Sequence, residues 1–94
     1  MNSIIDSHLK QLVTNYRGAN LTIELDQNEC RLLINGLVRE QRELASAITL
    51  SSTVQTDYEW HEFIQGTITR SDDSLTMVLS ANNVEIARQD FSVP

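Results

Sequence analysis

The spacing of apolar residues changes near residue 17, and this change constrains the fold more than any other feature of the sequence. Ile5, Leu9, Leu12 and Tyr16 follow one another at three or four residues, the spacing of one face of a helix. From Leu21 onward, apolar residues recur at every second position, as they do on one face of a strand. The sequence therefore predicts an α+β fold, in which one N-terminal amphipathic helix packs on an antiparallel sheet.

Local signals give this helix a beginning and an end. Ser3 and Asp6 have the spacing of a capping box, in which Asp replaces the usual Glu or Gln. Gly18 is a typical residue for the end of a helix. We therefore expect the helix to lie between Ser3 and Gly18.

The rest of the chain predicts five or six strands in meander order. We expect them at about residues 20–25, 30–39, 45–56, 60–70, 74–80 and 84–91. Residues 26–29 and 81–83 are rich in turn formers, and the charged run 39–43 is interpreted as a loop. Gly66, inside a strand, indicates a bulge or a bend. A curved sheet around one helix, forming a single domain over residues 1–94, is the expected architecture.

Length and charge limit the class of protein. The 94 residues include thirteen acids and seven bases, a formal net charge of −6. Such a charge repels phosphate backbones, so direct binding to DNA or RNA is disfavoured. Cys30 has no second cysteine with which to pair, and no secretory leader or apolar membrane span is apparent. These features predict a cytoplasmic protein with no membrane association.

The densest group of functional side chains lies between Asp57 and Phe63. Tyr58, Trp60 and Phe63 are aromatic residues of the kind enriched at protein interfaces, so we assign them as candidate partner-binding residues. Glu59 and His61 share a strand face and offer a base with an orienting carboxylate, or a weak metal pair. A strand with aromatic anchors on one face and solvated charges on the other explains the same pattern without any chemistry.

Other reactive side chains fit structural roles better. His8 lies near the edge of the predicted apolar stripe, and Cys30 suits a small buried apolar position. Asp72 and Asp73 suit a turn, because the spaced oxygen ligands and glycine of a calcium loop are missing. We therefore predict no catalytic residue, no metal and no cofactor.

The stretch from Leu32 to Val38 is apolar on both predicted faces. Leu33 and Leu37 are expected on the face opposite to Leu32, Ile34 and Val38. A strand with two apolar faces is either central in the sheet or covered by a second subunit. Leu33 and Leu37 are therefore candidate residues of a homodimer interface.

These observations favour a non-catalytic protein-binding module, such as an inhibitor, an immunity-type protein or an adaptor, that acts as a homodimer. One alternative is a small-molecule pocket between the helix and the curved sheet. Its predicted lining is Leu9, Leu12, Tyr16, Ile48, Leu50 and Ile68. A third hypothesis is an enzyme that uses Glu59 and His61.

Overall fold

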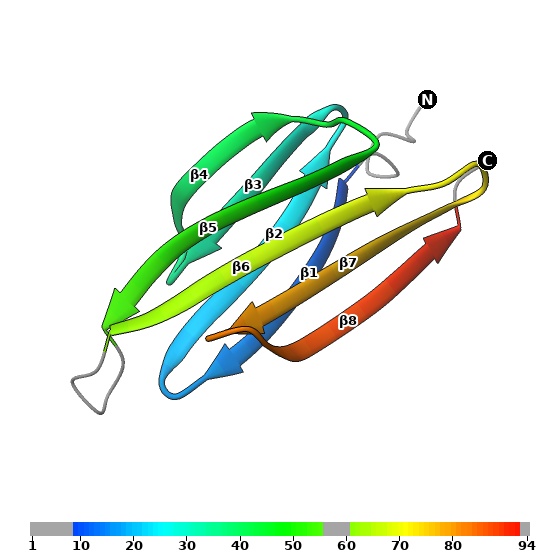
Figure 1. The fold of residues 1–94 in the computed structure, drawn as a ribbon. Coiled ribbons are helices and arrows are strands. Elements are labelled where there is room, and N and C mark those ends of the chain that lie inside the picture. Colours follow the sequence, from blue (N-terminus) through cyan, green and yellow to red (C-terminus); the bar gives the residue numbers. More distant parts are fainter. Residues whose placement is uncertain (1–8, 56–60, 93–94) are drawn as a thin grey trace, which may run out of the picture.

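The chain folds into eight antiparallel strands arranged as two four-stranded sheets (Figure 1). The computed structural model describes residues 9–55 and 61–92. The strands are β1 (Leu9–Tyr16), β2 (Ala19–Asp26), β3 (Glu29–Ile34), β4 (Leu37–Glu43), β5 (Ala47–Gln55), β6 (His61–Arg70), β7 (Ser74–Ala81) and β8 (Val84–Ser92). No helix able to span a bilayer is found in these two ranges.

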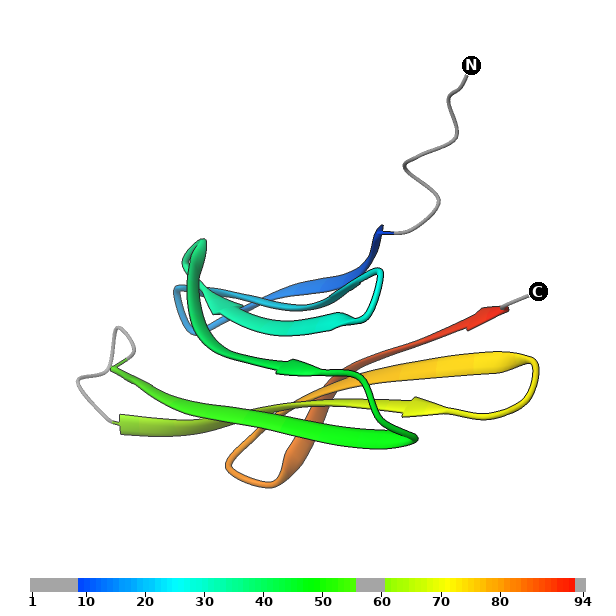
Figure 2. The same cartoon turned by 90° about the horizontal axis from the view of Figure 1, so that it is seen from above.

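Each sheet is a meander of consecutive strands. The first sheet has the order β1-β2-β3-β4 and the second has the order β5-β6-β7-β8. Figure 2 shows them as two layers, and the chain passes from one layer to the other between β4 and β5. The molecule is therefore a β-sandwich, in which two apolar faces bury each other.

The predicted α+β fold is wrong, since residues 9–16 of the expected helix form strand β1. The other part of that helix, residues 1–8, lies outside the described residues. Leu12 and Tyr16 are four positions apart, which puts them on one face of a helix and also on one face of a strand. Leu12 is buried in the strand, whereas Leu9 and Val13 are exposed. The spacing of these apolar residues therefore did not distinguish the 3.6-residue repeat of a helix from the two-residue repeat of a strand.

Two-residue turns of one backbone type join strands at three places in residues 9–55 and 61–92, two of which were predicted wrongly from the sequence and one correctly. Arg17–Gly18, Asn35–Gly36 and Asn82–Asn83 have positive φ at both positions, between 49° and 86°. This backbone belongs to the tight hairpin turns that match the twist of paired strands. Arg17–Gly18 joins β1 to β2 where a helix end was predicted, and the hairpin at Asn82–Asn83 is confirmed.

Asn35–Gly36 divides the predicted strand 30–39 into the hairpin of β3 and β4. The charged run 39–43, predicted as a loop, is the greater part of β4. Its side chains are mostly exposed because β4 is an edge strand of the first sheet. The sheet expected to contain five or six strands is therefore two sheets of four.

The strands of the second half agree with the sequence pattern. The segments expected near 45–56, 60–70, 74–80 and 84–91 are β5, β6, β7 and β8. Side chains at every second position of β6 and β7 are buried, as alternation predicts. The buried apolar residues of both sheets form one core: Leu12, Ala19, Leu21, Ile23, Leu25, Cys30, Leu32, Ile34, Leu50, Val54, Ile64, Ile68, Leu75, Met77, Leu79 and Ala81.

Gly66, on the central strand β6, lies directly against a side chain of the other sheet. A Cβ atom added at Gly66 would lie 2.8 Å from Cδ1 of Ile23 and 3.2 Å from its Cβ. The expected bulge is not found there, because Gly66 pairs with Leu50 and Leu79 in unbroken register. The glycine is needed for close approach of the sheets.

We predict that Gly66→Ala destabilises the protein, because the new methyl group overlaps a buried isoleucine. Overpacking of this kind costs about 1 to 3 kcal/mol in the free energy of unfolding. Urea denaturation followed by circular dichroism measures the change.

The matched control is Gly66→Ala combined with Ile23→Val, which removes the Cδ1 atom that meets the new methyl group. In a double-mutant cycle, the alanine substitution should cost less in the Ile23→Val background than in the wild type. Equal costs in the two backgrounds would show that the contact with Ile23 is not the reason for the glycine.

Candidate functional site

The outer face of the first sheet carries a row of three apolar side chains and one threonine that crosses all four strands. Val13 pairs with Thr22, Thr22 with Leu33, and Leu33 with Val38. Directly paired residues share a face, so these four side chains lie next to one another. Val13 is 51 % exposed and Val38 is 50 % exposed. We call Val13, Thr22, Leu33 and Val38 the apolar row.

A row of charged and amide side chains runs beside the apolar row. It consists of Gln11, Glu24, Arg31 and Gln41, again paired from strand to strand. Glu24 is buried and accepts hydrogen bonds from Gln11 Nε2 at 2.8 Å and from Arg31 Nε at 2.6 Å. The hydrogen bond to Glu24, together with a second one to Asp26, raises the pKa of Arg31. The charged groups of this row therefore already have hydrogen-bond partners within the sheet.

Asparagine side chains occupy the other side of the apolar row. Asn15 pairs with Asn20, and Asn20 Nδ2 donates to Asn15 Oδ1 at 3.3 Å. Asn35 Oδ1 accepts a hydrogen bond from the backbone N–H of Asn20 at 2.9 Å. The apolar row thus has charges on one side and uncharged amides on the other.

The two residues predicted for a dimer interface lie on different faces. Leu33 belongs to the apolar row, whereas Leu37 pairs with Ile34, whose side chain is in the core. The tight turn at Asn35–Gly36 and the irregular register after Leu32 separate the two leucines. Leu37 nevertheless remains 68 % exposed, because the edge strand β4 covers little of the core.

The aromatic cluster predicted for partner binding is described only in part. Phe63 is exposed on the outer face of the second sheet, opposite in direction to its buried neighbours Glu62 and Ile64. Tyr58 and Trp60 lie outside the described residues. Glu59 and His8 also lie outside them, and His61 is an exposed side chain at the start of β6.

Glu62 is a buried carboxylate that the sequence pattern did not single out. It is 2 % exposed and faces inward beside the β1–β2 and β7–β8 turns. Arg17 Nη1 donates to Glu62 Oε2 at 3.0 Å, and Tyr16 Oη donates to Oε1 at 3.4 Å. Asn82 Nδ2 also donates to Oε1. Glu62 therefore joins the turns of both sheets at one end of the sandwich.

The environment of Glu62 changes its pKa in two opposite directions. Burial raises the pKa, but the hydrogen bonds from Asn82 and Arg17 and the positive charge of Arg17 outweigh burial and lower it below the ordinary value of 4.5. The carboxylate is therefore charged at neutral pH, with donors arranged to hold that charge. This arrangement suits a structural clamp.

The remaining sequence candidates have structural positions. Cys30 is in the core, where burial, with a smaller effect of Glu29, raises the pKa of its thiol. Asp72 and Asp73 lie in the β6–β7 turn, where Ser71 N donates to Ser74 O at 3.0 Å. No group of three metal-ligating side chains occurs in residues 9–55 and 61–92.

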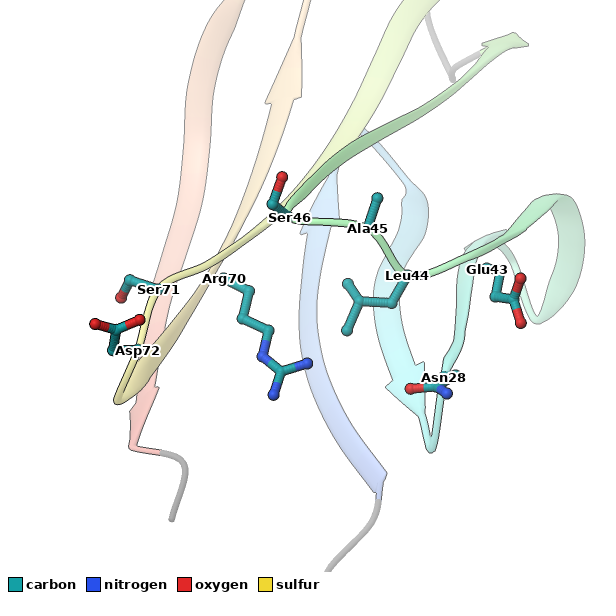
Figure 3. A pocket seen from close by; sticks show the side chains of 8 residues that line it. All are labelled: Asn28, Glu43, Leu44, Ala45, Ser46, Arg70, Ser71 and Asp72. Carbon is teal, nitrogen blue, oxygen red and sulfur yellow. The ribbon is translucent and has the colours of Figure 1, made fainter.

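The predicted ligand pocket required a helix, and Leu12, Leu50 and Ile68 are instead packed in the core. A different pocket, of about 650 Å³, lies at the end of the sandwich where β4 leads into β5. Figure 3 shows the side chains that line it. Its lining consists of Asn28, Glu43, Leu44, Ala45, Ser46, Arg70, Ser71 and Asp72. Sequence reasoning missed this pocket because turns from both sheets form it.

Comparisons with protein-family models, with curated proteins and with solved structures gave no match.

We predict that Glu62 makes the protein less stable in acid. A carboxyl group whose pKa is lower in the folded state than in the unfolded state stabilises the fold above the unfolded pKa. This contribution is lost as the pH falls from about 4.5 through the lower folded pKa. Thermal unfolding between pH 7 and pH 3 should therefore show a smaller loss of stability in acid for Glu62→Gln than for the wild type.

Glu85→Gln is the control. Its carboxyl also has a lowered pKa, because Arg88 Nε and Nη2 donate to it, but both side chains are exposed. High salt should remove the effect of Glu85→Gln and leave most of the effect of Glu62→Gln. Parallel acid profiles of wild type and Glu62→Gln would contradict the assignment of Glu62 as a charged clamp.

Proposed function

We propose that this protein is a non-catalytic protein-binding module that forms a homodimer through the outer face of its first sheet. The observation that carries the proposal is the apolar row, with Val13 and Val38 half exposed at its two ends. Apolar side chains in a continuous patch on a sheet face are typical of an interaction surface. The occupant we assign to this face is a second copy of the chain.

The pattern of rows supports a second copy. In a dimer with two-fold symmetry, each subunit contributes the same patch. A two-fold axis that runs along the apolar row, across the strands, would place the row against its own copy. It would place Glu24 opposite the partner's Asn20 and Arg31 opposite the partner's Asn35. Carboxylates of the two subunits would then avoid one another, although the chain has a net charge of −6.

The use of the polar side chains supports binding over catalysis. Glu24 and Glu62, the two buried carboxylates of the described residues, each accept hydrogen bonds from several side chains of the fold. Such groups are held in one position by the fold, which favours a structural role over proton transfer. We also propose a cytoplasmic location, which fits the one unpaired cysteine, Cys30.

A dimer through the first sheet would leave the outer face of the second sheet accessible. Phe63 lies on that face, near the segment that contains Tyr58 and Trp60 in the sequence. We therefore keep Tyr58, Trp60 and Phe63 as the proposed surface for a different protein, which fits an adaptor or inhibitor.

We predict that wild-type protein has the mass of a dimer and that Val38→Glu has the mass of a monomer. A buried carboxylate in the apolar row would have no partner, and its desolvation would oppose association. Light scattering after size-exclusion chromatography at about 100 µM measures the mass, since a micromolar dimer is populated at that concentration.

Val84→Glu is the matched control, because Val84 is 64 % exposed but belongs to β8 of the second sheet. It should leave the dimer intact, and circular dichroism should show that both variants fold. A monomeric wild type would overturn the proposed dimer. A wild-type dimer that Val84→Glu disrupts and Val38→Glu does not would place the interface on the second sheet and contradict the proposal.

A further inference from the structure

Two basic side chains from different sheets line one pocket at one end of this acidic protein. Most of the other basic side chains, Arg17, Arg31, Arg42 and Arg88, each form an ion pair with a carboxylate, and Arg39 donates to Ser52 Oγ at 3.4 Å. Within residues 9–55 and 61–92, no such ion pair is found for Lys10 or Arg70. Both of these cations line one small pocket of about 200 Å³.

The fold directs both cations to the same end of the sandwich. Lys10 pairs with Leu25 on the inward face of β1, so its side chain is partly buried at the edge of the core. Arg70 is the last residue of β6, where its backbone N–H donates to Ser46 O at 2.9 Å. Figure 3 shows the Arg70 side chain extending from the end of β6 into the space beside Leu44.

The lining of this pocket combines positive charge with apolar and amide groups. Its residues are Lys10, Leu25, Gln27, Asn28, Leu44, Arg70 and Leu75, and none of them is acidic. Three leucines offer contact to an aliphatic chain, and the two amides can donate hydrogen bonds. A pocket with these groups is complementary to a small anion that has an apolar part.

We propose that this pocket binds the carboxylate of a small organic acid. The planar guanidinium of Arg70 matches a carboxylate with two parallel hydrogen bonds, and Lys10 adds a second positive charge from the opposite sheet. The short aliphatic chain of the acid packs against Leu25, Leu44 and Leu75. The site is separate from the outer face assigned to dimerisation.

The neighbouring residues select against phosphate. The larger adjoining pocket shares Asn28, Leu44 and Arg70 with this one, but it is also lined by Glu43 and Asp72. These carboxylates offset part of the attraction that Arg70 and Lys10 exert on any anion, and inorganic phosphate has no apolar part with which to contact the leucines. The volume of about 200 Å³ suits an acid of a few carbon atoms.

The test is a titration of the full chain, labelled with ¹⁵N, with sodium butyrate followed by NMR. We expect saturating shifts at Arg70 Nε and at the amides of Leu44 and Ser46, with a dissociation constant of about 1 to 10 mM. Arg70→Gln and Lys10→Gln should each weaken binding by about tenfold, since each removes a charge-assisted contact. Amide shifts far from the pocket show whether each variant is folded.

Arg39→Gln is the matched control, because it removes the same charge from β4, outside this pocket. It should leave the butyrate affinity unchanged. Acetate tests the apolar contact and should bind more weakly than butyrate. N-acetyl-leucine tests whether a peptide carboxylate also fits. Inorganic phosphate should bind more weakly than acetate and butyrate.

Two results would overturn the proposal. One is the absence of saturating shifts with every carboxylate at concentrations up to about 100 mM, well above the expected dissociation constant. The other is butyrate binding that Arg39→Gln weakens as much as Lys10→Gln and Arg70→Gln do, because this would report net charge and not a site.

Discussion

The close approach of β6 to β2 is the constraint on which the rest of the structure depends. Gly66 presents no side chain to the other sheet, and Ile23 fills the space that a Cβ would need. Both strands are central in their sheets, so this contact lies within the interface between the two layers. A side chain at position 66 would overlap Ile23 and would oppose the close packing of the core residues of the two sheets.

The sequence predicted the strands of the second sheet and β2 of the first sheet, but it missed β1 and the hairpin of β3 and β4, for a physical reason. In β6 and β7, buried and less buried positions alternate, so the pattern of apolar residues identifies the strands. β2 was also predicted, at residues 20–25, although outward-facing Glu24 is buried under Gln11 and Arg31. β1 was missed because the spacing of Leu12 and Tyr16 fits a helix as well as a strand. Asn35–Gly36 carried the strongest hairpin signal in the chain, and the apolar run around it concealed that signal.

The candidate surfaces depend on register and on the packing of the sheets, which sequence spacing does not provide. Leu33 was identified from its position in an apolar stretch, but Val13 and Val38 become its neighbours only through strand pairing. Lys10 and Arg70 are far apart in the chain and line the same pocket because the two sheets end at the same place. A pattern of residues along one strand contains no information of this kind.

The passage from β4 to β5 at residues 44–46 has a consequence for how the chain completes its sandwich. All strand pairs join consecutive strands within residues 9–43 or within residues 47–92, so the backbone ladders are local and favour rapid formation of each sheet. Two chains that exchanged their second sheets would keep every ladder and every contact of the core. The two sheets pack equally well in both cases, so the geometry of residues 44–46 determines whether one chain forms both layers of a sandwich or two chains exchange them.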